Sequence, residues 1–155
     1  MNKVIFAAGC FWSIQESFDS IPGVLNTVVG YTGGNDDKPT YESVCSGETN
    51  HAEAIEIEFN SSEVSLQKLL DVFWTIHDPT TKDRQGPDIG TQYRSEIFYL
   101  NNEQKFIYEQ SKLKMNQNKF KGKIVTEISK AKTFFPAEEY HQKYNKKMKA
   151  NYGIS

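Results

Sequence analysis

The sequence contains few of the residues that form disulfides, cysteine metal sites or membrane anchors. It has only two cysteines, Cys10 and Cys45, in 155 residues, which are too few for a disulfide framework or a cysteine zinc site. No apolar run approaches the ~20 residues of a membrane-spanning helix, and the apolar stretch at the N-terminus is too short for a signal peptide. These absences predict a cytoplasmic protein without a membrane partner, whose thiols stay reduced.

Metal and phosphate motifs are also missing. The three histidines, His51, His77 and His141, lie far apart in the chain without a metal-ligand spacing. The segment His51-Ala52-Glu53 resembles half of a zinc deaminase motif, but the Pro-Cys-x-x-Cys half is absent. No glycine-rich phosphate-binding loop occurs. We therefore expect chemistry that needs neither a metal nor an organic cofactor.

Basic side chains are scarce in the first two thirds of the chain, and acidic side chains are scarce in the last third. Residues 1–104 hold 16 acidic and 6 basic side chains, whereas residues 105–155 hold 4 acidic side chains and 12 lysines. Such asymmetry can indicate a face that binds nucleic acid. Both arginines, Arg84 and Arg94, lie outside the basic segment, and arginine is the usual reader of base edges. The pattern therefore favours lysine-coated surface helices and no nucleic-acid partner.

No repeat, low-complexity tract or proline-rich linker divides the chain, so we predict one domain over residues 1–155. Hydrophobic periodicity separates strands from helices. The predicted strands are Lys3–Ala7, Val24–Tyr31, His51–Phe59, Tyr93–Leu100 and Lys123–Ser129. The predicted helices are Phe11–Phe18, Ser65–His77, Asn102–Asn118 and Pro136–Lys149, and the longer loops are Thr32–Thr40 and Thr80–Gln92. This order predicts an α+β fold, an α/β sandwich with helices packed on a central mixed sheet.

Cys10 is the first candidate for chemistry, because it follows a strand and Gly9 and stands where a helix begins. The free N–H groups and the dipole of a helix start favour negative charge, which predicts a depressed pKa and a nucleophilic thiol. The alternative is a small buried core residue, which is common for cysteine. Phe11 and Trp12 cannot both face one core from a helix start, so one or both are candidates to line a pocket beside the sulfur.

Glu53 is the second candidate, because two-residue periodicity places it on the same strand face as the apolar residues Ile55, Ile57 and Phe59. Burial should raise the pKa of this carboxyl, and a carboxyl that is protonated near neutral pH can serve as a general acid. The alternative is a residue at the strand end that reaches solvent.

Several motifs then follow one another in a fixed order. They are Gly9-Cys10-Phe11-Trp12, Gly30-Tyr31-Thr32-Gly33-Gly34, Pro39-Thr40-Tyr41, Val44-Cys45-Ser46-Gly47, His51-Ala52-Glu53, Phe73-Trp74, His77-Asp78-Pro79, Arg84-Gln85-Gly86 with Asp88, Gly90-Thr91-Gln92-Tyr93-Arg94-Ser95, Pro136-Ala137-Glu138 and Tyr140-His141-Gln142. The series covers nearly the whole chain and resembles the A-type peptide methionine sulfoxide reductases (MsrA).

The resemblance implies an enzyme that reduces the S epimer of methionine sulfoxide, in proteins and as the free amino acid. Its nucleophile would be Cys10, which attacks the sulfoxide sulfur, releases methionine and is left as a sulfenic acid. Glu53 would protonate the sulfoxide oxygen, Tyr41 and Tyr93 would hydrogen-bond it, and Asp88 would support the site. Phe11 and Trp12 would surround the substrate methyl group. Reasoning from the residues alone reaches Cys10, Glu53 and the aromatic pair, but not Tyr41, Tyr93 or Asp88.

The sequence departs from the family pattern in three places. Ser13 follows the GCFW motif, Asn50 replaces a glycine before His51, and Ser155 stands where many members carry a resolving cysteine. Cys45 belongs to a motif whose cysteine is not generally the resolving one. The resemblance therefore implies that an external thiol, such as glutathione with glutaredoxin, reduces the sulfenic acid, whereas thioredoxin normally acts on a disulfide.

Two other classes of function remain open at this point. Cys10 could serve a thiol peroxidase or a cysteine hydrolase, although no base is visible beside it in the sequence. The chain could also be a module that binds oxidised methionine without turnover, which would require an unreactive Cys10.

Overall fold

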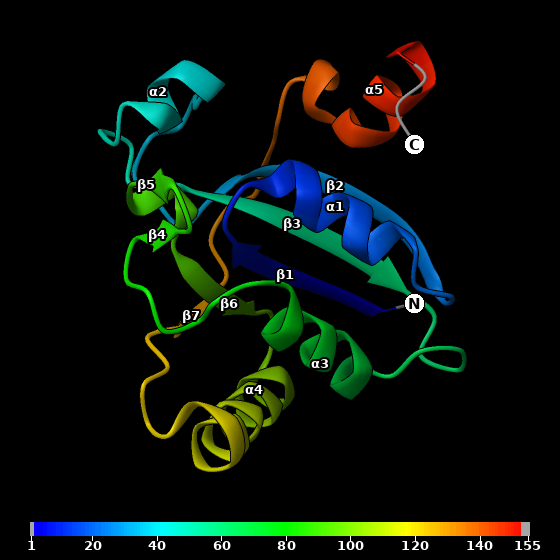
Figure 1. Ribbon diagram of the computed structural model, residues 1–155, viewed down its shortest axis with the longest axis vertical. Helices are drawn as coiled ribbons and strands as arrows, with labels where there is room; N and C mark the ends of the chain where they lie inside the picture. Colours follow the sequence, from blue (N-terminus) through cyan, green and yellow to red (C-terminus); the bar gives the residue numbers. More distant parts are fainter. Residues whose placement is uncertain (1, 153–155) are drawn as a thin grey trace.

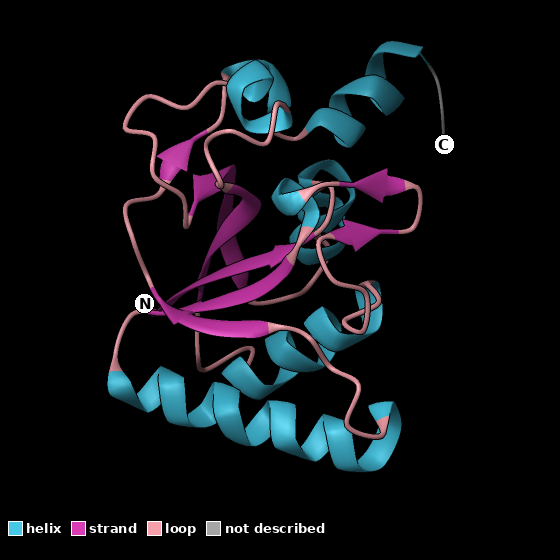
Figure 2. Ribbon diagram, turned by 90° about the vertical axis from the view of Figure 1, so that its left-hand side faces the viewer, coloured by secondary structure: helices cyan, strands magenta, loops and turns pink. Residues whose placement is uncertain are grey.

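The computed structural model describes residues 2–152, and its centre is a six-stranded mixed sheet in the order β7-β6-β1-β3-β2-β8 (Figures 1 and 2). Neighbouring strands are antiparallel except β6 and β7, which are parallel. The strands are β1 (Asn2–Ala8), β2 (Val24–Thr32), β3 (Ala52–Phe59), β6 (Ser95–Tyr99), β7 (Glu127–Lys130) and β8 (Phe135–Pro136). A separate two-stranded hairpin consists of β4 (Arg84–Gln85) and β5 (Asp88–Ile89).

The helices are α1 (Phe11–Asp19), α2 (Tyr41–Cys45), α3 (Leu66–Ile76), α4 (Asn102–Met115) and α5 (Tyr144–Tyr152), with shorter turns η1 (Thr91–Tyr93), η2 (Asn116–Phe120) and η3 (Glu139–His141). Helices α2, α3 and α4 begin at polar caps that the sequence supplies. Ser65 and Asn101 accept backbone N–H groups at the starts of α3 and α4. Thr40 and Ser43 form a reciprocal capping box at the start of α2.

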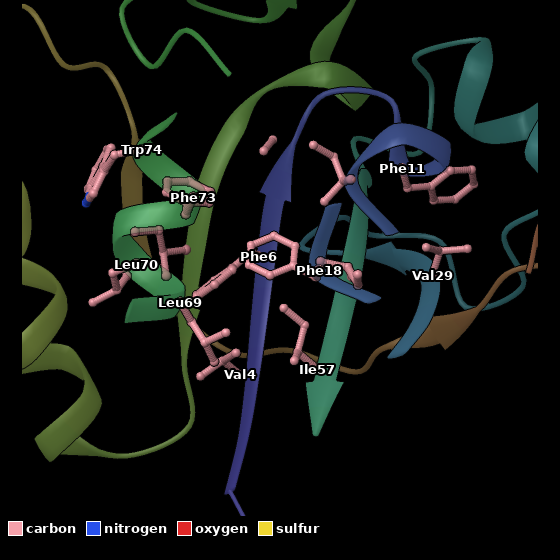
Figure 3. Packing of buried hydrophobic residues seen from close by; sticks show 14 of the residues in the cluster. Val4, Phe6, Phe11, Phe18, Val29, Ile57, Leu69, Leu70, Phe73 and Trp74 are labelled. Carbon is pink, nitrogen blue, oxygen red and sulfur yellow. The ribbon is translucent and has the colours of Figure 1, made fainter. Parts of the chain in front are cut away.

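The main core lies between one face of the sheet and helices α1 and α3 (Figure 3). Phe6 of β1 is fully buried, and its ring centre lies 5.7 Å from that of Phe18 of α1 and 5.2 Å from that of Phe73 of α3. Ile5 and Phe98 face the other side of the sheet, where a smaller cluster packs under the segment before β8. The predicted α+β class, with helices packed on a mixed sheet, is confirmed.

The predicted elements of the first half of the chain are correct to within one or two residues. The helix predicted at Ser65–His77 is capped by these two residues, and the strand predicted at His51–Phe59 is β3. Two features were not predicted, namely α2 and the β4–β5 hairpin inside the loop expected at Thr80–Gln92. Both are too short for periodicity to reveal.

The predictions for the second half need correction. The strand expected at Tyr93–Leu100 begins only at Ser95, because residues up to Tyr93 form η1, and the strand expected at Lys123–Ser129 begins at Glu127. The helix predicted at Asn102–Asn118 is α4, whose last turn widens into η2.

The helix predicted at Pro136–Lys149 is wrong over its first half, because this segment contacts β2 and contains only the short turn η3 instead of an α-helix. The side-chain amide of Gln142 accepts the Val29 N–H at 3.0 Å and donates to the Val29 carbonyl at 2.9 Å. Lys143 then has a φ of 58°, and the helix starts only at Tyr144. Ser155, which is part of the predicted tail, lies outside the described residues.

The arrangement leaves α2 and α5 at the end of the molecule opposite to α4 (Figures 1 and 2). Cys10 lies at this end, where β1 leads into α1, and the side chains discussed below gather around it. No helix within residues 2–152 is long and apolar enough to cross a membrane.

Candidate active site

Gly9 allows the chain to turn from β1 into α1 directly beside the β4–β5 hairpin. Its φ is +96°, a conformation that residues with a side chain rarely adopt. A Cβ atom at this position would lie only 2.7 Å from Cγ of Gln85. Cys10 follows as the N-cap of α1 and is partly buried. The sequence therefore places a thiol at the helix start, as predicted.

Glu53 lies next to this helix start, and its burial is confirmed. It is the second residue of β3, pairs with Tyr31 of β2 and is 1% exposed. Its Oε1 accepts the Phe11 N–H at 3.1 Å. Burial raises the pKa of Glu53 to about 7, with a smaller contribution from the negative charge of Asp88, while the Phe11 N–H acts in the opposite direction. The carboxyl is therefore protonated in a large share of molecules near neutral pH.

The depressed pKa expected for Cys10 is wrong. Burial is the largest cause and, together with the negative charges of Glu53 and Asp88, raises the pKa of the thiol to about 11. The backbone N–H groups of Trp12 and Ser13 lower the pKa, as expected at a helix start, but their effect is smaller. Because Glu53 contributes through its charge, protonation of Glu53 makes ionisation of Cys10 easier.

Tyr93, Tyr41 and Asp88 lie at the same place, although the sequence separates them widely. Burial is the largest cause and, together with the charges of Glu53, Cys45, Asp88 and Cys10, raises the pKa of Tyr93 to about 12. Burial also raises the pKa of Tyr41, with contributions from Cys45 and Glu53. Both tyrosines are therefore neutral hydrogen-bond donors at physiological pH. Asp88 lies in β5, and its charge affects the pKa of Cys10, Glu53 and Tyr93.

The aromatic pair after Cys10 divides between the core and the site. Phe11 is 1% exposed and packs against Tyr31, with ring centres 5.8 Å apart. Trp12 is half-buried and stacks on Tyr144 of α5, with ring centres 3.9 Å apart and an interplanar angle of 12°. Its Nε1–H donates to Nδ1 of His141 at 2.9 Å. Trp12 therefore lies between the helix start and α5, with its indole ring held from two sides.

Glu138 and His141 also belong to the site, and reasoning from the sequence assigned no role to either. The Tyr31 hydroxyl donates to one oxygen of Glu138 at 2.7 Å, and the Tyr41 N–H donates to the other at 3.0 Å. Glu138 therefore joins β2 to the start of α2 and holds Tyr41 in place. Both residues belong to the motifs Pro136-Ala137-Glu138 and Tyr140-His141-Gln142. These motifs contributed to the family resemblance, but no role was derived from them.

Cys45 lies at the exposed rim of this site, at the end of α2. Burial raises the pKa of its thiol, hydrogen bonding with the Tyr41 hydroxyl lowers it, and the charge of Glu53 raises it.

His51 and His77 have structural roles, since His51 accepts the Gly34 N–H and His77 contacts the Phe73 carbonyl and the Ser95 hydroxyl. Within residues 2–152, no group of three or more His, Cys, Asp or Glu side chains is arranged to hold a metal ion.

A family model described as peptide methionine sulfoxide reductase matches residues 2–154. The chain belongs to the peptide methionine sulfoxide reductase family. MsrA from Methanosarcina acetivorans is 55% identical over 148 residues, which cover 95% of this chain and 79% of that protein. The enzyme is therefore a thiol-dependent oxidoreductase that reduces methionine sulfoxide.

Solved structures of the family share the fold. Mxr1 from Saccharomyces cerevisiae in its reduced form superposes with a TM-score of 0.90 at 36% identity, covering 94% of this chain and 84% of that one. Mxr1 in complex with Trx2 gives a TM-score of 0.67 at 26% identity, over 92% and 84% of the two chains. Membership of this family favours sulfoxide reduction over the peroxidase, hydrolase and binding-module alternatives for the chain.

Proposed function

We propose that residues 1–155 act as one catalytic domain in which Cys10 is the nucleophile and Glu53 the proton donor. The observation that carries this assignment is the pairing of a partly buried thiol at the start of α1 with a buried carboxyl whose pKa is about 7. A sulfoxide is a weak electrophile until its oxygen is protonated or strongly hydrogen-bonded. A carboxyl that keeps its proton at neutral pH supplies that proton where it is needed.

The proposed step balances in atoms, electrons and protons. The sulfur of Cys10 bonds to the sulfoxide sulfur, Glu53 gives its proton to the oxygen, and the thiol proton returns to the Glu53 carboxylate. The bond between substrate sulfur and oxygen then breaks and the oxygen bonds as a hydroxyl to the Cys10 sulfur. The S–S bond breaks in the same transfer, so that the methionine thioether leaves and Cys10 is left as a sulfenic acid. The substrate sulfur is reduced and the Cys10 sulfur is oxidised by the same two electrons.

Tyr41, Tyr93 and Asp88 act on this step through hydrogen bonds and charge. The two neutral tyrosine hydroxyls donate to the sulfoxide oxygen and stabilise the charge that develops on it. The Asp88 carboxylate contributes to the raised pKa of Glu53 and so keeps the proton on the donor. Tyr41 is held for this role by Glu138, which binds its backbone N–H.

The half-buried Trp12 forms the site of the substrate methyl group, and the buried Phe11 supports this site from the core. Glu53 and the tyrosines hold the sulfoxide oxygen, Trp12 holds the methyl group, and Cys10 approaches the sulfur from a fixed direction. These three constraints fix the orientation of the groups around the sulfur. Such a site accepts one configuration at sulfur, which the family resemblance identifies as S. The proposed substrates are oxidised methionine in proteins and free methionine sulfoxide.

The reductant of the sulfenic acid is an external thiol in this proposal. Cys45 is the second cysteine of the chain, and it lies on the rim beside Tyr41 rather than at the helix start. Thiols of a reducing cytoplasm, such as glutathione with glutaredoxin, can condense with a sulfenic acid and be removed by exchange. The complex of the yeast relative with Trx2 supports a thioredoxin as a donor as well.

Turnover of the separated sulfoxide epimers tests this proposal. Each epimer is supplied with glutathione plus glutaredoxin, with thioredoxin and its reductase, or with a small dithiol, and methionine is quantified. We expect turnover of the S epimer with an external thiol donor and none of the R epimer. Equal turnover of both epimers would contradict the three-point arrangement of the substrate.

A further inference from the structure

Tyr93 is carried by a turn that is too short to be rigid on its own. It is the last residue of η1, a helical turn of three residues that follows Gly90. The Tyr93 N–H donates to the Gly90 carbonyl at 3.1 Å, and the Arg94 N–H donates to the Thr91 carbonyl at 3.2 Å. A single turn of helix is not stable alone in water, because fixing its backbone costs more than its few hydrogen bonds return. The direction of the Tyr93 side chain therefore depends on groups outside the turn.

The guanidinium of Arg94 is such a group. Its Nη1 donates to the Thr91 carbonyl at 2.9 Å, and the same oxygen accepts the Arg94 backbone N–H. Its Nε donates to Oε1 of Glu96 at 2.7 Å. A guanidinium is planar and rigid, so two hydrogen bonds in different directions fix both its position and its plane. Arg94 therefore ties the backbone of η1 to the side chain of Glu96.

Glu96 gives this link a rigid base in the central sheet. It is the second residue of β6 and lies opposite Ala7 of β1 on one side and Glu127 of β7 on the other. The side chains of Arg94 and Glu96 are 12% and 6% exposed, so salt screens their ion pair little. Ala7 lies near the end of β1 that leads into Cys10. Glu96 therefore relates the position of η1 to that of the nucleophile.

Gly33 leaves room for the guanidinium on its other side. A Cβ atom at this position would lie 2.9 Å from Nη2 of Arg94, and the φ of Gly33 is +87°. Gly33 directly follows β2, so the loop after β2 packs against Arg94. The guanidinium is therefore placed by three separate segments, namely this loop, η1 and β6.

We propose that Arg94 and Glu96 are positioning residues that set the direction of the Tyr93 hydroxyl relative to Cys10. The inference rests on the proposed role of Tyr93 as a hydrogen-bond donor to the sulfoxide oxygen. A buried ion pair stabilises a fold no better than apolar side chains of similar volume, whereas its directional hydrogen bonds define the orientation of the η1 backbone. A donor stabilises the developing charge only when it points at the oxygen. Arg94 thus affects the release of methionine through Tyr93.

The test is a pair of double-mutant cycles on the first turnover, in which methionine release is measured with saturating S methionine sulfoxide. Arg94→Lys keeps the charge, but an ammonium does not reproduce the rigid fork between Thr91 and Glu96. We expect it to slow methionine release by about 10-fold, which is less than the ~10²–10³-fold cost of removing an oriented donor. In a Tyr93→Phe protein the same change should have an effect within about twofold, because both variants remove one interaction. In a Tyr41→Phe protein the full loss of about 10-fold should remain, since Tyr41 lies on a different element.

Arg84→Lys is the matched control, because it is the same substitution at an exposed arginine of β4. It should leave methionine release within about twofold of the unmodified protein. Thermal unfolding of each variant separates a folding defect from a loss of positioning. If Arg94→Lys does not fold, Glu96→Gln takes its place in both cycles, because its amide oxygen accepts from Nε more weakly than a carboxylate does. A smaller loss, again confined to proteins that keep Tyr93, is then expected.

The two cycles have distinct outcomes. An unchanged rate in Arg94→Lys, or an equal loss in the Tyr93→Phe and Tyr41→Phe proteins, would overturn the positioning role while leaving the proposed function intact. If Tyr93→Phe alone leaves methionine release unchanged, the proposed role of Tyr93 itself fails, and the inference fails with it.

Discussion

Replacing Cys10 by serine is expected to abolish reduction of methionine sulfoxide, while Cys45→Ser keeps most of the activity. Cys10 stands at the start of α1 beside Glu53 and Asp88, whose charges act on its thiol. A serine hydroxyl cannot accept the oxygen, whereas a thiol accepts it and becomes a sulfenic acid. The variant therefore has no residual route for the same step. The measurement is methionine released per enzyme in a single turnover and with a dithiol in excess.

Cys45→Ser is the matched control for this change. It is the same substitution at an exposed thiol on the rim of the site. Retention of activity in Cys45→Ser together with its absence in Cys10→Ser assigns the chemistry to Cys10. Comparable losses in the two variants would reject that assignment, because the thiols would then act as a pair.

Glu53→Gln is expected to slow the release of methionine by ~10²–10⁴-fold, the usual contribution of general acid catalysis. This factor corresponds to about 2.7–5.5 kcal/mol in the activation free energy. The glutamine amide can still donate a hydrogen bond to the sulfoxide oxygen, but it cannot transfer a proton. The first-turnover rate should therefore fall far more than substrate binding weakens.

The same variant tests the electrostatic coupling between Glu53 and Cys10. In a Cys45→Ser background, the pH dependence of alkylation with iodoacetamide reports the pKa of Cys10, which is about 11 with Glu53 present. An ionised Glu53 disfavours the thiolate, so Glu53→Gln should lower this pKa and speed alkylation at mildly alkaline pH. Burial, the largest cause, remains, so the pKa of Cys10 should stay above its ordinary value.

Glu58→Gln is the control for both measurements. Glu58 lies on β3, five residues from Glu53, and is only partly buried. It should change neither the release of methionine nor the pKa of Cys10. If Glu53→Gln raised only the Michaelis constant and left the first turnover unchanged, Glu53 would be a binding residue and not the proton donor.

The sequence was sufficient to predict the parts of the fold that follow hydrophobic periodicity. β3 and α3 were predicted nearly to their ends, and the burial of Glu53 followed from the apolar face of β3. The first half of the segment Pro136–Lys149 was predicted wrongly, because its shape depends on hydrogen bonds between Gln142 and β2, more than one hundred residues away. Contacts of this kind leave no periodic pattern in the segment itself.

In the candidate site, too, local features were predicted and features that depend on long-range contacts were not. The position of Cys10 at a helix start is a local property and was predicted, but the pKa of its thiol depends on burial and on Glu53 and Asp88, which the fold brings together. Tyr41, Tyr93 and Asp88 were identified by resemblance alone, since nothing in their own neighbourhoods marks them. Their roles in the reaction remain proposals that the variants above address.

The most direct test of the account is mass analysis of the protein after one equivalent of S methionine sulfoxide, with no reductant present. The account predicts that one equivalent of methionine is released and that Cys10 carries a sulfenic acid. This species is detected as one added oxygen atom or, after reaction with a dimedone-type reagent, as the thioether adduct on Cys10, with Cys45 unmodified. Release of methionine with Cys10 unoxidised would contradict the central role of this thiol. A disulfide between Cys10 and Cys45, formed as fast as methionine is released, would contradict reduction by an external thiol and would make Cys45 the resolving residue.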